Sequence, residues 1–144
     1  SIPSYLAGNV ARVGTRILRQ VLKQHGLRLS HHAVLIALRD FGPLAQYELA
    51  DRLDVDRSQV VGFVDRLEHM GMVTRARDAR DRWKVLVSLT AEGERIERQI
   101  THAARSSQAT LLGALSPAER AELLRLLQLV LDAHDEARLK LTVS

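Results

Sequence analysis

Apolar residues recur at helical spacing in two short consecutive segments between residues 47 and 70. In the second segment they are Val60, Phe63, Val64, Leu67 and Met70. Positions three and four residues apart share one face of a helix, so this segment predicts a helix with one buried side. Asp54 lies at the junction, where a left-handed residue is needed, and aspartate tolerates that conformation better than most residues other than glycine. The pattern predicts two helices joined by a tight turn.

The opposite side of the second helix is polar. Asp56 is expected to cap this helix, with Gln59 completing a capping box. The residues on the open side are Arg57, Ser58, Gln59, Gly62 and Arg66. A polar face near the start of the second helix is typical of a helix-turn-helix that reads the DNA major groove. We expect these five residues to contact DNA, with Gln59 bonding an adenine edge. An ordinary helical hairpin with a solvated face is the alternative.

The segment that follows predicts a basic β-hairpin. Gly71 is a typical helix-ending residue, and the aliphatic runs 72–74 and 85–89 predict two strands. Between them stand five basic residues, Arg75, Arg77, Arg80, Arg82 and Lys84, against two acidic ones, Asp78 and Asp81. Phosphates attract such a hairpin, and its tip can reach an adjacent minor groove. We therefore expect all five basic residues to contact DNA; the alternative is a hairpin whose charges only keep it soluble.

Several runs in this region match one known family. They are AVLIAL at 33–38, GPL at 42–44, ELADRL at 48–53, DRSxV at 56–60, VDRLE at 64–68, DxxD at 78–81 and VLVSLTxEG at 85–93. Through these runs, residues 29–93 resemble the MarR family of bacterial transcription regulators. The resemblance implies a winged helix between long helices that build a homodimer. It also implies repression rather than activation, because the family mostly represses.

Three positions depart from the family pattern. The family often has Thr-x-Thr-Arg where this chain has Gln59, Val61 and Gly62, so we expect it to read a different base sequence. Asp54 replaces a common glycine. In the hairpin, Trp83 stands where the family pattern has an arginine. We expect Arg80 or Arg82 to take the role of that arginine in the minor groove.

Helices are also predicted on both sides of the winged helix. Residues 4–25 and 30–41 carry apolar stripes, and Ser30 is expected to cap the second of these helices. Thr90 is expected to begin a helix that runs to about Leu112.

The last helix is apolar around nearly its whole circumference. It is expected to start at Ser116-Pro117-Ala118-Glu119, which combines a cap, a first-turn proline and a capping-box glutamate, and to run to about Leu139. Its apolar residues are Leu123, Leu124, Leu126, Leu127, Leu129, Val130 and Leu131. A helix that is apolar all round must be buried on more than one side, and a second copy of the chain would cover it.

These patterns predict a single mainly α domain over residues 1–144, with a small β-hairpin wing. The flanking helices, in residues 1–29 and 91–144, would form a homodimer. Residues 30–90 would form the winged helix-turn-helix that binds DNA.

The resemblance further implies a pocket between the dimerising helices and the winged helix, often filled by aromatic or phenolic acids. Arg16, His32, Leu35 and Ile36 are this chain's candidates for that pocket. Arg16 would pair with the ligand carboxylate, where charge-assisted hydrogen bonds are strongest. The ligand would change the spacing of two recognition helices that must enter grooves about 34 Å apart. Ordinary structural roles are the alternative for all four residues.

Composition agrees with a nucleic-acid partner. Of the 144 residues, 46% are hydrophobic and only 3% aromatic, so the core is expected to consist of Leu, Val, Ile and Ala. The net charge is +4 and the pI is about 10.1, which suits a polyanion. The chain has no cysteine, which excludes disulfides and thiolate metal sites. No signal segment or long apolar run is present, so we expect no membrane partner and a cytoplasmic protein.

No catalytic motif stands out. The sequence has no glycine-rich phosphate loop, nucleophile elbow or HExxH zinc motif, and we predict no enzyme activity, no metal and no cofactor. The predicted function is a dimeric repressor that a small ligand releases from a palindromic operator. The alternatives are a winged-helix module that binds protein and an enzyme with an unrecognised site.

Overall fold

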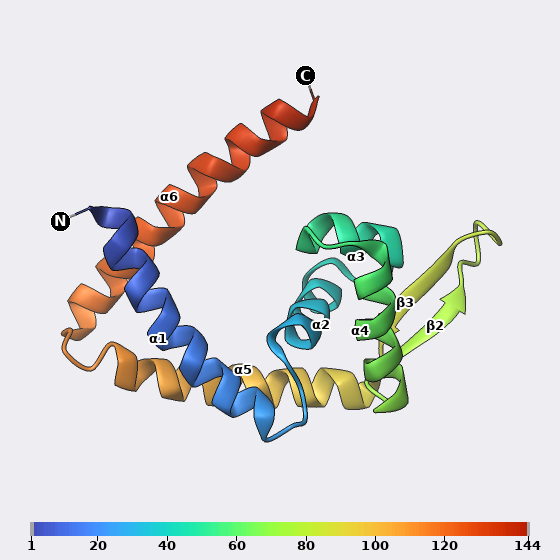
Figure 1. Ribbon diagram of the computed structural model, residues 1–144, viewed down its shortest axis with the longest axis horizontal. Helices are drawn as coiled ribbons and strands as arrows, with labels where there is room; N and C mark the ends of the chain where they lie inside the picture. The colour runs from blue at the N-terminus through green and yellow to red at the C-terminus, as the bar shows by residue number, and fades with distance from the viewer. Residues whose placement is uncertain (1, 144) are drawn as a thin grey trace. The chain divides into compact units, whose positions relative to one another are not determined.

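The computed structural model describes the backbone of residues 2–143 and the side chains of residues 2–134. The chain divides into two compact units, Ser1–Ser107 and Gln108–Ser144. The elements of the first unit are α1 (Pro3–Lys23), α2 (Leu29–Phe41), β1 (Leu44–Ala45), α3 (Gln46–Leu53), α4 (Arg57–His69), β2 (Val73–Arg77), β3 (Val85–Leu89) and most of α5 (Ala91–Leu111). Figure 1 shows β2 and β3 projecting beyond α3 and α4 as a hairpin. The predicted mainly α fold with a small β wing is confirmed.

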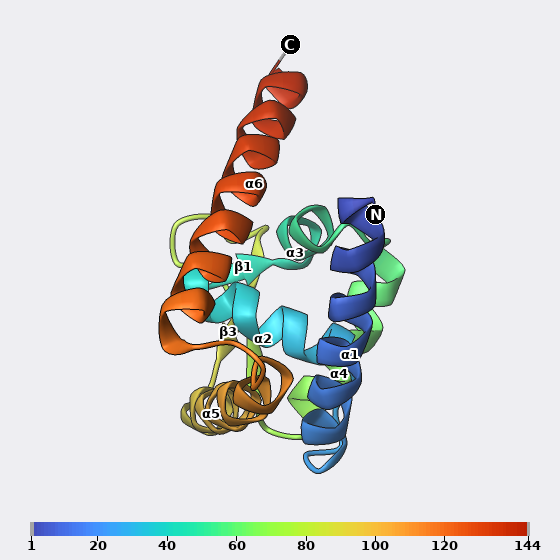
Figure 2. The ribbon, with the colours of Figure 1, turned by 90° about the vertical axis from the view of Figure 1, so that its left-hand side faces the viewer.

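The sheet has one strand more than the sequence predicted. Its order is β1-β3-β2, with both pairs antiparallel, and Figure 2 shows β1 leading directly into α3. Leu44 of β1 pairs with Val87 of β3. A two-residue strand is too short to produce an alternating pattern, and its partner lies more than forty residues away in the sequence, so nothing local identifies it.

Strand β2 is also longer than predicted. It runs from Val73 to Arg77, with Val73 opposite Leu89 and Arg77 opposite Val85. Arg75 therefore lies in the middle of a strand rather than in the hairpin loop. The loop itself is reduced to residues 78–84.

Aliphatic side chains alone form the fully buried core of the winged helix. They are Leu22, Val34, Leu35, Leu49, Val60, Val64, Leu67, Val73, Val87 and Ile100. These residues come from α1 to α4, the sheet and α5, so the core joins the helix-turn-helix to the base of the wing. The prediction of a core without aromatic residues is confirmed for the fully buried positions.

The turn between α3 and α4 has the predicted geometry. Asp54 adopts a left-handed conformation, with φ 54° and ψ 50°. The backbone N–H of Val55 donates to the carbonyl of Ala50, a small residue that is 5% exposed. The backbone N–H of Asp56 donates to Gln59 Oε1 at 3.2 Å, which forms the glutamine half of the expected capping box.

The start of α2 corrects one prediction. Ser30 was expected to cap this helix, but α2 begins at Leu29 and Arg28 occupies the N-cap position. The side chain that satisfies the first turn is that of His31, whose Nδ1 accepts the backbone N–H of Arg28 at 3.0 Å. The capping-box pattern expects Glu or Gln as the acceptor, whereas here the acceptor is an imidazole. The pattern therefore did not identify Arg28 as the cap, and the nearest serine was chosen instead.

The second unit contains α6 (Pro117–Val143). Its start is the predicted reciprocal box: Ser116 N–H donates to Glu119 Oε1 at 2.9 Å, and Glu119 N–H donates to Ser116 Oγ at 3.2 Å. The helix extends a few residues past the predicted end at Leu139. Six large apolar residues of α6 are exposed in the single chain: Leu124, Leu126, Leu127, Leu129, Val130 and Leu131.

Candidate nucleic-acid interface

The outer face of α4 presents the predicted DNA-contacting residues to solvent. Arg57, Ser58, Gln59, Gly62 and Arg66 are all exposed. The opposite face packs Val60, Val64 and Leu67, each with 0% exposure, into the core. A β-carbon built on Gly62 would meet no described atom within 4 Å. Core packing therefore does not require glycine at this position, and the bare backbone lies on the open face.

The ring of Tyr47 in α3 lies close to two basic side chains, one at the start of α4 and one at the base of the wing. The guanidinium of Arg57 lies 5.6 Å from the centre of the Tyr47 ring, and Lys84 Nζ lies 5.8 Å from it. Lys84 additionally pairs with Glu48 at 3.1 Å. A backbone hydrogen bond from Ala45 and the contact with Lys84 lower the pKa of Glu48, and the same contact raises the pKa of Lys84. Lys84 therefore ties the wing to α3.

Arg75 makes contacts that the sequence did not predict. It was expected to be one of five DNA-binding cations, but its guanidinium lies between β2, α3 and α4. Its Nη2 is 2.6 Å from Asp65 and its Nη1 is 3.0 Å from Glu68, and Gln46 Oε1 accepts from both Nε and Nη2. Two carboxylates thus neutralise a positive charge that was expected to face DNA phosphates. In this geometry Arg75 anchors the wing to the recognition helix.

Two aspartates shape the loop at the tip of the wing. Asp78 Oδ1 accepts the backbone N–H of Arg80, and Asp81 Oδ1 accepts that of Trp83, both at 3.0 Å. Arg77 Nη1 donates to the carbonyl of Arg82 at 3.2 Å. These contacts leave the side chains of Arg80 and Arg82 exposed. The two acidic residues fold the loop, and Arg80 and Arg82 face solvent.

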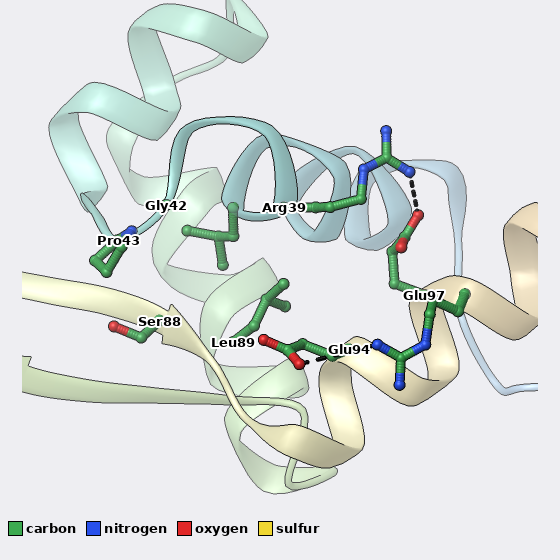
Figure 3. Close-up of a pocket in the computed structure, with 9 residues that line it drawn as sticks. Arg39, Gly42, Pro43, Ser88, Leu89, Glu94 and Glu97 are labelled. Atoms are coloured by element: carbon green, nitrogen blue, oxygen red, sulfur yellow. Dashed lines mark hydrogen bonds and ion pairs between the residues drawn. The ribbon is translucent and has the colours of Figure 1, made fainter.

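A cavity of about 550 Å³ lies where α2, β3 and α5 meet. Figure 3 shows Arg39 reaching from α2 to Glu97 on α5. Glu97 has only 3% of its side chain exposed and also accepts the hydroxyl of Thr101 at 2.6 Å. Close by, His32 is 6% exposed and its Nε2 has no hydrogen-bond partner among the described residues. Burial lowers the pKa of His32, against the opposing field of Glu97 and with a smaller effect of Arg39.

A second cavity, of about 610 Å³, lies between the start of α2 and the outer face of α4. It is lined by Gly26, Arg28, Ser30, His31, Ser58, Gln59, Gly62, Phe63 and Arg66. His31 meets Phe63 edge to face, with ring centres 5.9 Å apart. Burial first, then Arg66 and Arg28, lower the pKa of His31. An aromatic ring beside two guanidinium groups suits an aromatic anion.

The four predicted ligand residues are not brought together around either cavity. Arg16 is exposed on α1, Ile36 is half-buried, and Leu35 has 0% exposure within the core. His32 is buried beside Glu97. His31 and Arg66 line the same cavity because α2 crosses α4, and no local sequence pattern reveals that crossing.

In the described part of the chain, none of the helices combines the length and the apolar character that a membrane span requires. Nor does that part contain a group of three or more His, Asp or Glu side chains placed to hold a metal ion.

Comparison with known proteins places these features in a family. The model of the MarR family matches residues 27–85. The transcriptional repressor NicR of Pseudomonas putida is 33% identical over 123 residues, which cover 85% of this chain and 78% of that protein. The transcriptional regulator HosA of Escherichia coli O157:H7 is 31% identical over 112 residues, covering 72% of this chain and 83% of HosA.

Solved structures give the same result. Wild-type MarR from Escherichia coli, in its apo form, superposes with a TM-score of 0.79 at 28% identity, over 91% of this chain and 98% of that one. BpsR from Bordetella bronchiseptica, whose DNA binding is regulated by 6-hydroxynicotinic acid, gives a TM-score of 0.74 at 27% identity, over 92% and 94% of the two chains. Both superpositions extend over about nine-tenths of this chain, well beyond the residues that the family model matches.

Proposed function

This chain belongs to the MarR family of DNA-binding transcription regulators, and we propose that it is a homodimeric repressor that a small aromatic acid releases from a palindromic operator. The observation that carries the proposal is the exposed polar face of α4 beside a wing whose tip presents Arg80 and Arg82. A recognition helix and a cationic wing on one rigid core can contact a major groove and the adjacent minor groove together.

The exposed apolar residues of α1 and α6 support a dimer. On α1, Ile2, Tyr5, Leu6, Val10 and Val13 are exposed, as are six residues of α6. Removing such apolar surface from water lowers the free energy by about 25 cal/mol per Å². A second copy of the chain would cover them and would place two recognition helices on two half-sites, so the operator would be palindromic.

The cavity between α2 and α4 supports a ligand that competes with DNA. Arg66 faces this cavity and also belongs to the outer face of α4. A carboxylate held by Arg28 and Arg66 would neutralise a cation that DNA also needs. A ligand releases DNA only if it binds the DNA-free protein more tightly than the DNA-bound protein. Competition between ligand and DNA for the Arg66 guanidinium provides that difference. The regulation of BpsR by 6-hydroxynicotinic acid makes hydroxylated aromatic acids the first class to test.

Mobility shift with the promoter next to the protein's own gene tests the central proposal. We expect a shift at low salt that an unrelated duplex does not compete away. If no genomic fragment is shifted at any salt concentration, the repressor proposal is wrong and a protein-binding winged helix becomes the better account. The oligomeric state is measured in parallel by light scattering, with Leu127→Glu as a variant that should produce a monomer with weaker operator binding.

Release by ligands is tested on the same complex. We expect 6-hydroxynicotinic acid or a related aromatic acid to release wild-type protein at lower concentration than Arg28→Ala. Arg16→Ala is the matched control, because Arg16 lies on α1 outside the α2–α4 cavity. If Arg16→Ala loses the response and Arg28→Ala keeps it, the site predicted around Arg16, His32, Leu35 and Ile36 is the correct one. If no such acid releases DNA at millimolar concentration, this ligand class is wrong.

A further inference from the structure

Trp83 is the only tryptophan of the chain, and most of its side chain is exposed to solvent. It is 88% exposed at the tip of the wing, more than any other large apolar residue described. The chain contains only five aromatic residues of the Phe, Tyr and Trp types. Side chains of this size normally bury most of their surface. An indole held in water at this position therefore requires an explanation other than folding.

The backbone around Trp83 is fixed on both sides. Its N–H donates to Asp81 Oδ1 at 3.0 Å, and the preceding carbonyl, that of Arg82, accepts from Arg77 Nη1 at 3.2 Å. The next N–H, that of Lys84, donates to the Asp81 carbonyl at 3.0 Å. The loop is thus pre-organised, so presenting the indole to a partner costs little conformational entropy.

The charges beside Trp83 indicate which partner it meets. Arg82 is its neighbour in sequence, Arg80 stands on the same loop, and both are exposed. Asp78 and Asp81, the acidic residues of the loop, accept backbone N–H groups within it. A tip that presents two guanidinium groups is attracted to phosphates, and it belongs to the same hairpin that Arg75 anchors against the recognition helix.

We propose that Trp83 is itself a DNA-contacting residue that enters the minor groove beside each half-site, flanked by Arg80 and Arg82 on the phosphates. This inference rests on the proposed DNA-binding function and extends it. The indole packs its apolar face against the deoxyribose walls. Its Nε1–H donates to the acceptors on the groove floor, adenine N3 or thymine O2.

The proposed contact predicts a distinctive sequence preference. The minor groove of a G·C pair carries the guanine amino group, which A·T pairs lack. That group would obstruct the indole, so the wild type should prefer A·T pairs at the flank reached by the wing. This preference comes from an apolar contact, and its contribution to affinity should depend little on salt, unlike that of the arginines.

The sole tryptophan makes the contact directly measurable in the full-length protein. We expect the promoter duplex to change Trp83 emission and to reduce its quenching by acrylamide, with saturation at the same concentration as the mobility shift. Trp83→Ala should weaken operator binding roughly five- to tenfold, within the range of losing one specific contact. Its salt slope should stay unchanged, whereas Trp83→Arg should recover affinity with a slope steeper by about one unit.

Base analogues identify the groove. Replacing flanking A·T pairs by G·C should weaken the wild type, and inosine·C, which lacks the amino group, should restore binding. Trp83→Ala should respond to neither change, and its melting temperature should match the wild type because the side chain is exposed.

Several outcomes would overturn the inference. If the operator is bound but emission, quenching and the affinity of Trp83→Ala are all unchanged, the inference fails while the repressor proposal stands. An emission change on protein dilution without DNA would show instead that the indole contacts a second copy of the chain. If no duplex is bound at all, the repressor proposal and this inference fall together.

Discussion

Arg75 of β2 and Asp65 of the recognition helix α4 lie 2.6 Å apart, and the same guanidinium reaches Glu68 one turn further along α4. The pair joins the helix and the hairpin that we propose contact two neighbouring grooves of DNA. Arg75 has 21% of its side chain exposed, while the carboxylates are 61% and 44% exposed. Loss of Arg75 would therefore leave no buried charge, and we expect this residue to position the wing.

Arg75→Ala should separate this role from phosphate binding. We expect a stability loss of about 1 kcal/mol, typical of partly exposed ion pairs, and weaker operator binding because the wing is no longer held against α4. The slope of affinity against salt should stay as in the wild type. A slope reduced by about one unit would show that Arg75 contacts a phosphate directly. Arg75→Lys is the control that keeps the charge but loses the forked contact with Asp65 and Gln46.

The double variant Arg80→Ala/Arg82→Ala should keep its stability and show a smaller salt slope, the reverse of the result expected for Arg75→Ala. Both side chains are exposed on the wing loop, so their removal should leave the melting temperature unchanged. Binding to all sequences should weaken, and the salt slope should fall by about two units if both contact phosphates. The measurement is a titration of operator and unrelated duplex between low and moderate salt. An unchanged slope would show that Arg80 and Arg82 do not contact phosphates.

Gln59 has two roles in this structure, which a pair of variants can separate. Its Oε1 caps α4 by accepting the N–H of Asp56, and its amide is expected to bond adenine N6 and N7. Gln59→Ala should lower stability by about 1 kcal/mol and change the preferred base at one position per half-site. Gln59→Glu keeps a capping acceptor but cannot donate to N7, so only base preference should change. Selection from a randomised half-site measures it; an identical preferred site for all three proteins contradicts the assignment.

His32 makes stability sensitive to mild acid. Its pKa lies below the usual value of about 6.5 because the imidazole is buried, with Glu97 opposing and Arg39 reinforcing the shift. The unfolded chain therefore binds a proton in a range where the folded chain does not. Stability from this group is fully present above about pH 6.5 and is lost as the pH falls toward the folded pKa.

His32→Leu tests that assignment and removes the unpartnered Nε2. Denaturant melts at pH 7.5 and pH 5.5 should show a smaller loss of stability in the variant than in the wild type. His31, whose pKa is lowered in the same direction, gives the matched control His31→Gln, which should retain the part of the acid sensitivity due to His32. An equal loss in wild type and His32→Leu would show that other groups are responsible.

The sequence predicted the local geometry well, because single residues determine it. Asp54 was expected to be left-handed, and Gly71, which has a φ of 75°, was expected to end α4. Helix starts with an ordinary cap, such as Ser116, were also recognised. Each of these features depends on residues within four positions of one another, which is the range that patterns describe.

Features that depend on tertiary contacts were missed. Strand β1 exists because Leu44 lies beside Val87, and Arg75 is neutralised because β2 passes α4 at Asp65. A count of charges along the hairpin cannot show which basic residues meet carboxylates of another element, so the contacts of Arg75 were not predicted. DNA contact by Arg75 stays a prediction. The cavity between His31 and Arg66 was missed for the same reason. DNA contact by the predicted residues of α4 remains a prediction.

The empty space above Gly62 has a consequence for how related regulators diverge. A side chain added there would meet no described atom within 4 Å, and replacing glycine by a residue such as alanine inside an exposed helix gains about 1 kcal/mol. The outer face of α4 therefore has room at this position for a side chain that could contact a base. A single codon change could assign a descendant of this protein to different promoters, without any compensating change in the protein interior.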